Sequence, residues 1–295
     1  MNRAWVLAAR PATLPAAAVP VLVGTAAAIG EGFVFRPTVF AVTLLCALLI
    51  QVGTNFANDY SDFIRGADTS DRLGPVRVTQ SGLLSQSAVR SGIIVAFGAA
   101  VLLGAWLVWV GGWPIIAIGV LSVLSGLAYT GGPFPLGYHG LGDVFVFLFF
   151  GVIAVTGTAY LQSGEWSLYA LALSIPVGLL VTNILVVNNL RDRETDIIAG
   201  KRTLAVRIGD RATRAQYAGF AALAYVVPVF LATMGDFAPA LLLPILTLPL
   251  AFVLVKRVLG GASGRELNPL LEQSGKLLLF FGVLLAIGAM LSRTG

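Results

Sequence analysis

A group of carboxylate and amide side chains follows directly after an apolar run in this sequence. The run covers residues 39–50, and the polar residues that follow it are Asn55, Asn58, Asp59 and Asp62. Charged groups are costly in hydrocarbon, so carboxylates where an apolar helix ends are candidates for a functional site. At about 100° per residue in a helix, these four side chains share one face. Such a face could bind a hard divalent cation through its oxygens.

Acids and arginines alternate in the stretch after this face. Asp68 lies in a Gly-containing loop, and Arg72 and Arg77 come after it. Arginine binds oxyanions through paired hydrogen bonds. Carboxylates that repel one another suggest a metal ion between them, and the arginines suggest a polyanion. Residues 55–82 therefore predict a metal–polyanion site.

A second acidic helix end occurs in the later half of the chain. Asn188, Asp192 and Asp196 stand at successive i, i+4 positions where another apolar run ends. Asn55 and Asp59 have the same spacing as Asn188 and Asp192, and we interpret the two pairs as one local design. Two such ends that face each other could hold Mg²⁺, which uses a few carboxylates together with substrate phosphate oxygens.

A simpler interpretation exists for each acidic residue. A lone aspartate at a helix end is ordinarily a solvated cap or the ion-pair partner of a neighbouring arginine. Asp71 beside Arg72 and Asp210 beside Arg211 fit that description. The two matched helix faces do not, because an isolated cap requires no second acidic helix end.

The composition indicates an integral membrane protein. Of the 295 residues, 57% are hydrophobic and only 11% are charged, and the mean hydropathy is +0.89. A single cysteine, Cys46, excludes an intramolecular disulfide, and a single histidine excludes zinc motifs that need two. The basic, Ala-rich N-terminus resembles a signal peptide, but its prolines favour a kinked first membrane helix.

Apolar segments of spanning length predict an all-α integral membrane protein with nine transmembrane helices and a single domain over residues 1–295. The expected spans are 11–30, 37–57, 88–110, 113–130, 141–161, 167–188, 213–233, 238–255 and 274–292.

The distribution of charge predicts the orientation of these spans. With the N-terminus in the cytoplasm and the C-terminus outside, every basic residue except Arg36 and Arg293 falls on the cytoplasmic side. Every acidic residue except Glu31, Glu165 and Asp236 falls there too. Acids together with bases favour a metal–polyanion site over a surface that only binds anionic lipid. We expect a multi-pass protein of the plasma membrane with its site on the cytoplasmic side.

These motifs resemble those of the UbiA superfamily of intramembrane prenyltransferases. The first family motif, NDxxDxxxD, is matched by Asn58, Asp59 and Asp62, whereas its last aspartate is displaced to Asp68. The second, DxxxD followed by Gly and a basic residue with Thr, is matched by Asp192, Asp196, Gly200, Lys201, Arg202 and Thr203. The Arg-Pro-x-Thr start that is typical of the family begins at Arg10.

The stretches RPATLP, DRLGPVR and PLGYHGLGD are most similar to the branch that prenylates 1,4-dihydroxy-2-naphthoate. The resemblance implies helices around a central cavity that opens sideways to the lipid bilayer. It also implies Mg²⁺, a polyprenyl diphosphate donor and a decarboxylative transfer that yields demethylmenaquinol in menaquinone biosynthesis. No nucleic-acid partner is expected.

The expected roles of the site residues follow from the motifs and the resemblance together. Candidate catalytic and metal-binding residues are Asn55, Asn58, Asp59, Asp62, Asp68, Asn188, Asp192 and Asp196. Candidates for the diphosphate are Arg72, Arg77, Lys201 and Arg202, each of which could instead serve only the positive-inside topology. Candidates for the acceptor are Arg10, Tyr129, Tyr138, His139 and Asp143, for which a place at the membrane interface is the simpler alternative.

Three other functions would account for parts of this sequence. A secondary transporter also uses intramembrane acids, but here they gather at helix ends and not in mid-span. A non-catalytic quinone- or lipid-binding scaffold gives no reason for the paired acidic motifs. A prenyltransferase of the same superfamily that uses another acceptor, such as 4-hydroxybenzoate, would differ from the favoured function only in its second substrate.

Overall fold

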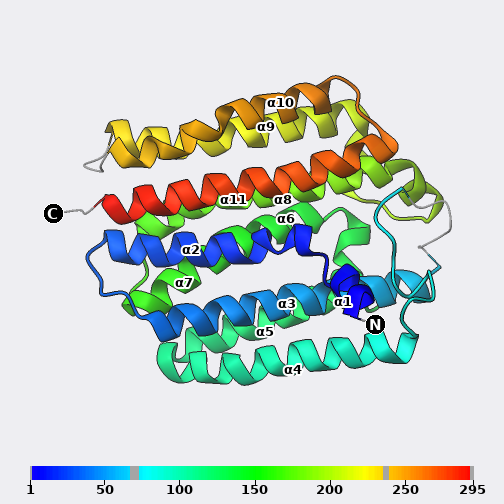
Figure 1. The fold of residues 1–295 in the computed structure, drawn as a ribbon, viewed down its shortest axis with the longest axis horizontal. Helices are drawn as coiled ribbons and strands as arrows, with labels where there is room; N and C mark the ends of the chain where they lie inside the picture. Colours follow the sequence, from blue (N-terminus) through cyan, green and yellow to red (C-terminus); the bar gives the residue numbers. More distant parts are fainter. Residues whose placement is uncertain (1, 67–72, 235–238, 293–295) are drawn as a thin grey trace.

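The protein is a bundle of long helices that run roughly alongside one another (Figure 1). The computed structural model describes residues 2–66, 73–234 and 239–292, and none of these residues lies in a strand. The elements are α1 (Asn2–Ala9), the 3₁₀ helix η1 (Pro11–Thr13), α2 (Pro15–Gly30), α3 (Pro37–Ile64), α4 (Gln86–Gly111), α5 (Trp113–Ala128), η2 (Leu136–His139), α6 (Gly142–Val146), the π-helix η3 (Phe147–Ile153), α7 (Ala154–Ser163), α8 (Leu168–Ile198), α9 (Leu204–Met234), η4 (Pro239–Thr247), α10 (Leu248–Leu259), η5 (Gly264–Glu266) and α11 (Leu267–Leu291). The prediction of an all-α fold is confirmed for the described residues.

The described residues contain seven helices that are long and apolar enough to cross a membrane. An eighth span results if the helical pair Arg3–Thr13 and Pro15–Gly30, which is bent by 51°, is counted as one. The remaining apolar helix, α5, has 16 residues and is about 24 Å long, shorter than the hydrocarbon core of about 30 Å.

The bend near the N-terminus occurs where three features coincide. Arg10 has a left-handed backbone with φ 51°, and Pro11 and Pro15 begin the two helical segments after it. Proline lacks an N–H and is favoured at the first position of a helix, so each proline starts a new segment. The bend brings the end of α1 beside the polar end of α3.

Two helices extend beyond the apolar spans predicted for them. The predicted span 37–57 lies within α3, which continues to Ile64. The predicted span 167–188 begins one residue before α8, which starts at Leu168 and continues to Ile198. The acidic motifs are therefore carried on the last turns of helices that have already crossed the apolar layer.

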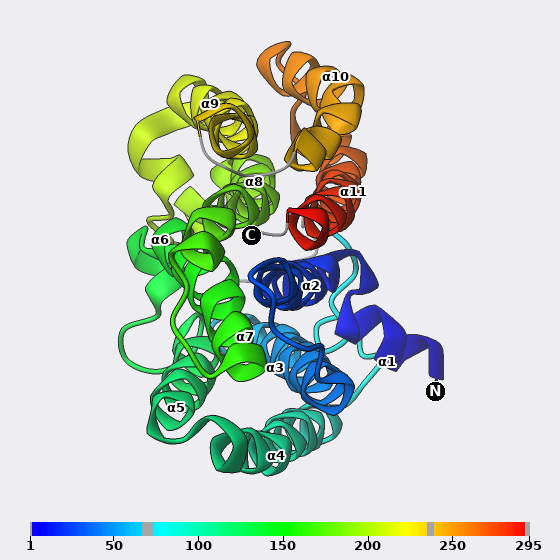
Figure 2. The ribbon, with the colours of Figure 1, turned by 90° about the vertical axis from the view of Figure 1, so that its left-hand side faces the viewer.

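The view along the bundle shows α2 among α3, α7, α8 and α11 (Figure 2). Small residues permit this close packing, as is common between membrane helices. A Cβ atom on Gly24 would lie 2.3 Å from the carbonyl oxygen of Val155, and one on Gly282 would lie 2.2 Å from Val19.

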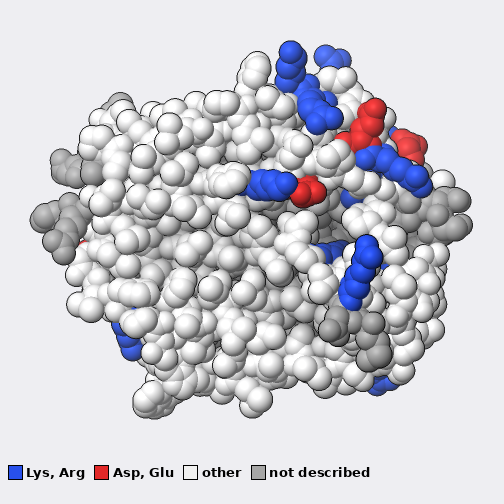
Figure 3. Space-filling view, in the orientation of Figure 1, with Lys and Arg blue, Asp and Glu red and all other residues white. Residues whose placement is uncertain are grey.

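Charged side chains gather at one end of the visible face, while most of the remaining surface is uncharged (Figure 3). Large apolar side chains are exposed over that remaining surface, such as Leu102 on α4 and Phe252 on α10. An apolar belt with charges beyond one edge is expected of a protein that faces lipid around its middle.

Candidate active site

A cavity of about 320 Å³ lies between α2, α3, α5, η3 and α8. Its apolar wall includes Ile50, Phe145, Phe149, Phe150, Val181, Ile184 and Leu185. Its polar lining includes Arg10, Gln51, Asn55, Asn58, Asp62, Arg77, Tyr129, Tyr138, Asn188, Asn189, Asp192, Asp196 and Lys201. One chamber therefore joins a charged region to an apolar one.

Helical spacing explains which residues of the two motifs reach the cavity. On α3, Asn55, Asn58 and Asp62 stand at i, i+3 and i+7 and share one stripe. On α8, Asn188 and Asp192 stand one turn apart in the same way. In the cavity, the α3 pair that corresponds to Asn188 and Asp192 is therefore Asn58 and Asp62. Of the pair Asn55 and Asp59, which has the same spacing, only Asn55 lines the cavity.

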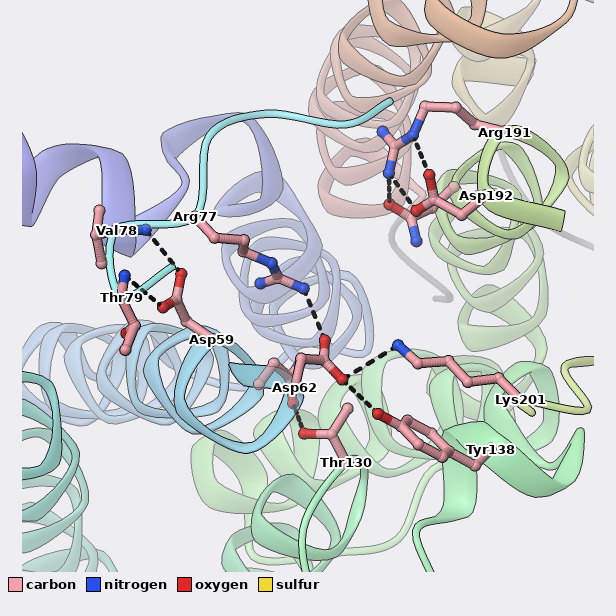
Figure 4. Close-up of polar contacts among 12 residues, drawn as sticks. Asp59, Asp62, Arg77, Val78, Thr79, Thr130, Tyr138, Arg191, Asp192 and Lys201 are labelled. Carbon is pink, nitrogen blue, oxygen red and sulfur yellow. Dashed lines mark hydrogen bonds and ion pairs between the residues drawn. The ribbon is translucent and has the colours of Figure 1, made fainter. Parts of the chain in front are cut away.

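Asp62 is the centre of a cluster of donors (Figure 4). Its Oδ2 accepts a hydrogen bond from the Arg77 guanidinium at 2.9 Å. Its Oδ1 accepts from the Tyr138 hydroxyl at 2.7 Å and from the Lys201 ammonium at 3.1 Å. The Lys201 nitrogen also lies 4.6 Å from the centre of the Tyr138 ring. Two cations on one buried carboxylate leave the cluster with a net positive charge, which suits an anionic ligand.

Asp59 has different partners and points to another side of α3 (Figure 4). Its two carboxylate oxygens accept the backbone N–H groups of Val78 at 3.1 Å and Thr79 at 3.0 Å. The side chain is buried, and Asp59 is not among the residues that line the cavity. This corrects the expectation that Asp59 shares the face of Asp62.

Asp192 is held by the residue immediately before it. The Arg191 guanidinium donates to the two Asp192 oxygens at 2.7 and 2.6 Å, and also to the side-chain oxygens of Asn188 at 2.8 Å and Asn268 at 3.0 Å. Asn268 in turn donates to the carbonyl oxygen of Leu73 at 2.9 Å. This network connects α8, α11 and the segment that leads to Arg77.

The other predicted residues divide between the cavity and its surroundings. Arg10, Tyr129 and Asp196 line the cavity. The Asn55 side-chain amide connects α3 to the bend near the N-terminus: it donates to the carbonyl oxygen of Ala9 at 2.9 Å and to the hydroxyl of Thr13 at 3.1 Å. Three further candidates are absent from the cavity lining: His139, Arg202 and Asp143. Asp68 and Arg72 lie outside the described residues.

Local contacts explain why those three candidates lie elsewhere. His139 stacks on Phe134 with ring centres 3.7 Å apart. Arg202 meets the loop through its backbone, whose N–H donates to the carbonyl of Tyr138 at 2.9 Å. Asp143 accepts a hydrogen bond from the Gln216 amide at 2.6 Å.

Several functional candidates become evident only in three dimensions. Thr130 donates to the side-chain oxygen of Asn58 at 2.8 Å and orients that amide. Arg191 holds Asp192 and Gln216 holds Asp143, while Asn268 accepts from Arg191. Arg191 had one signal in the sequence, its position next to Asp192. The other three are ordinary polar residues whose partners are distant in the chain.

The oxygen ligands in this cavity suit Mg²⁺. Asp62 with Asn58 and Asp192 with Asn188 provide two sets of carboxylate and amide oxygens, and Asp196 adds a third carboxylate. Among the described residues, no three acidic, histidine or cysteine side chains converge closely enough to hold a metal by themselves. That arrangement fits a magnesium ion bound by one or two carboxylates and completed by water and substrate phosphate.

Comparison with known proteins agrees with the sequence motifs. Residues 17–265 match the model of the UbiA prenyltransferase family. The chain is 40% identical over 285 residues to a 1,4-dihydroxy-2-naphthoate octaprenyltransferase of Mycobacterium tuberculosis, covering 96% of this chain and 95% of that protein. It is 36% identical to the protein of the same name from Escherichia coli, covering 99% and 96% of the two chains.

Solved structures show the same fold at much lower identity. A UbiA homologue from Archaeoglobus fulgidus bound to GPP and Mg²⁺ superposes with a TM-score of 0.65 at 15% identity, covering 96% of this chain and 100% of that chain. A homologue from Aeropyrum pernix gives a TM-score of 0.67 at 16% identity, covering 93% and 96%. Since sequence and fold agree over most of the chain, it belongs to the UbiA prenyltransferase family and is a membrane-embedded prenyltransferase.

Proposed function

We propose that this enzyme transfers a polyprenyl group from a polyprenyl diphosphate to 1,4-dihydroxy-2-naphthoate, with release of CO₂ and diphosphate, to give demethylmenaquinol for menaquinone biosynthesis. The observation that carries the proposal is the cavity itself, in which a positively charged cluster adjoins an aromatic and aliphatic wall. The names of the relatives at 40% and 36% identity support the choice of acceptor.

The donor's diphosphate would bind at the polar end of the cavity. Arg77 and Lys201, which contact Asp62 at 2.9 and 3.1 Å, are the cations positioned to donate to its oxygens. Tyr138 orients Asp62 through its hydroxyl. Fixed donors aimed at the oxygens that gain charge stabilise the departing diphosphate in the transition state.

Each magnesium ion would be held by one or two of the carboxylates of Asp62, Asp192 and Asp196 together with the amide oxygens of Asn58 or Asn188, and when bound it supplies Lewis-acid stabilisation of the leaving diphosphate. Asp59 is left out of this set because it does not line the cavity, and its two oxygens accept backbone amides on another side of α3. Arg191 neutralises Asp192 and holds Asn188, so it keeps that half of the set in place.

The apolar wall would bind the prenyl chain and protect the reacting carbon. Phe145, Phe149 and Phe150 line the cavity beside Ile184 and Leu185. Aromatic faces stabilise a neighbouring cation, and an apolar enclosure excludes water that would trap the allylic cation. An electron-rich ring carbon of the acceptor then forms the new bond, and the carboxyl group on that carbon leaves as CO₂.

We also propose that the chain crosses the plasma membrane nine times as one domain, with the N-terminus in the cytoplasm and the C-terminus outside. Seven long apolar helices, the bent N-terminal pair and α5 together make nine segments among the described residues. The charged end of the bundle, where the acidic motifs lie, would then face the cytoplasm.

The acceptor can be tested with the purified full-length protein in nanodiscs. With Mg²⁺ and a polyprenyl diphosphate, we expect prenylated product and stoichiometric CO₂ from 1,4-dihydroxy-2-naphthoate, and none from 4-hydroxybenzoate in the same mixture. Chelation of Mg²⁺ should abolish transfer, and its return should restore it. Transfer to the benzoate alone would refute the proposed acceptor, and binding of both substrates without transfer would refute the proposed reaction.

A further inference from the structure

The first acidic motif contains two buried carboxylates that differ in the kind of donor they accept. Asp62 accepts from three side chains, two of them cationic. Asp59 accepts from two consecutive backbone N–H groups, those of Val78 and Thr79. Side-chain donors can rotate towards a ligand, whereas backbone donors move only when the chain moves. The two aspartates therefore have different tasks.

The segment that Asp59 holds begins one residue after Arg77 and is compact. The Ser81 N–H and hydroxyl both donate to the carbonyl oxygen of Arg77, at 3.0 and 2.7 Å. The Leu84 N–H donates to the carbonyl of Val78 at 3.1 Å. The Val78 side chain is fully buried in a cluster with Phe56 and Leu84. Arg77 is thus the first residue of a turn that is fixed by hydrogen bonds and by packing.

Arg77 reaches the cavity from this turn. Its side chain is 7% exposed and its guanidinium contacts Asp62, so the backbone after Arg77 is fixed by Asp59 and the side chain by Asp62. Both acids lie on α3, three residues apart. Because consecutive Cα atoms are about 3.8 Å apart, a shift at Val78 is passed directly to Arg77.

We propose that Asp59 is a positioning residue: it anchors the 77–84 turn to α3 and thereby holds the Arg77 guanidinium where the donor's diphosphate binds. Asp59 acts through Arg77 and binds neither metal nor substrate. The inference rests on the proposed function only in that the anion offered to Arg77 is a prenyl diphosphate.

A double-mutant cycle tests this relation. The full chain in nanodiscs is titrated, at saturating Mg²⁺, with a prenyl thiodiphosphate whose C–S bond resists cleavage. Asp59→Asn replaces one acceptor oxygen by a donor that faces a backbone N–H, and we expect the Kd to rise about tenfold. Arg77→Gln should raise it at least as much. The double variant should bind no more weakly than Arg77→Gln alone, and additive effects would overturn the proposal.

Hydrogen exchange gives a second readout that requires no ligand. The amides of Val78 and Thr79 should exchange faster in Asp59→Asn and remain protected in Arg77→Gln. Unchanged exchange in Asp59→Asn would refute the anchor. Asp210→Asn removes a carboxylate that pairs with Arg214 on α9 and is the matched control, expected to alter neither exchange at these amides nor probe binding.

Two further arms keep the outcome decisive. If Asp59→Asn does not yield folded protein, Ser81→Ala loosens the same turn, and we expect a smaller loss of binding that disappears on the Arg77→Gln background; no loss would contradict the proposal. Wild-type protein that binds the probe but prenylates no acceptor would refute the proposed function alone. An additive cycle in an active enzyme would refute the anchor alone.

Discussion

At the scale of single residues, the buried carboxylate of Asp62 and the partly buried carboxylate of Asp192 are each neutralised by basic side chains. Asp62 has Arg77 and Lys201 as partners, and Asp192 has Arg191. Removal of one member of a buried ion pair is costly because it leaves an uncompensated charge in a poorly solvated place. Neutralisation of Asp62 would leave two cations without an anionic partner, whereas neutralisation of Asp192 would leave Arg191 with two other acceptors. The two variants should therefore differ in stability.

We predict that Asp62→Asn and Asp192→Asn both lose turnover at saturating Mg²⁺, by about 100-fold or more, since metal-assisted stabilisation is worth several kcal/mol. Only Asp62→Asn should also lower the Tm in detergent by several degrees, because Arg77 and Lys201 then face each other without an anion. In Asp192→Asn the Arg191 guanidinium keeps Asn188 and Asn268 as acceptors.

The control for this pair is Glu272→Gln, which removes the acid of an exposed ion pair with Lys276. Exposed pairs contribute little, so we expect wild-type turnover and Tm. Normal turnover in Asp192→Asn would contradict the metal site, and equal Tm values for the two site variants would contradict the charge argument.

At the scale of elements, the cavity wall depends on how closely η3 approaches α8. A Cβ on Gly151 would lie 2.5 Å from the Cα of Gly178, and one on Gly178 would lie 2.8 Å from the Phe147 ring. The π-helical turn of η3 thus meets α8 at a pair of glycines. Phe149 and Phe150 on η3 and Val181 on α8 line the cavity next to this crossing.

Gly178→Ala should therefore push the two helices apart. Overpacking of this kind costs about 1–3 kcal/mol, so we expect a lower Tm and a higher KM for the prenyl donor, whose chain contacts the displaced wall. Gly219→Ala on α9 is the matched control, because a Cβ there meets nothing within 4 Å. It should be neutral or slightly stabilising, as replacement of a helical glycine reduces the entropy of the unfolded chain. Equal behaviour of the two variants would refute a tight crossing.

At the scale of the whole molecule, charge and hydropathy divide the bundle along its length. Charged side chains gather at one end of the face in Figure 3, and uncharged residues cover most of the rest. Many large apolar side chains are exposed on the molecule. The acidic motifs lie at the end of α3 and of α8, so the site belongs to the charged end. Orientation in the membrane therefore decides which compartment supplies the soluble substrate.

The proposed orientation can be tested by labelling single cysteines in intact cells with an impermeant maleimide. In a Cys46→Ala background, Arg265→Cys, at an exposed position in η5, should be labelled only after the cells are opened. Glu165→Cys, in the exposed link between α7 and α8, should be labelled in intact cells. The reverse pattern would show that the topology is the opposite of the one proposed. Labelling of both cysteines in intact cells would show that an even number of crossings, and not the proposed three, separates the two positions.

The sequence by itself determined the class of the protein and predicted many of the polar residues that line its cavity. Hydropathy predicted the helices, since a backbone in lipid must satisfy its hydrogen bonds within each segment. The i, i+4 spacing of Asn188 and Asp192 placed both on one face of a helix, and Arg77, Lys201 and Tyr138 were recognised as candidates from type and motif. None of these inferences needed a partner from another helix.

Only the tertiary structure decided that Asp62 faces the cavity and that Asp59 faces the backbone of the 77–84 turn. Asp59 and Asp62 have the same side chain on the same helix, and spacing within α3 could not show what lies on each side. The 77–84 turn folds back against α3 and supplies two amides to Asp59, whereas Lys201 and Tyr138 arrive at Asp62 from other loops. Packing between segments distant in the chain set these partners, because local spacing fixes a residue's angle on its helix but not the neighbour it meets.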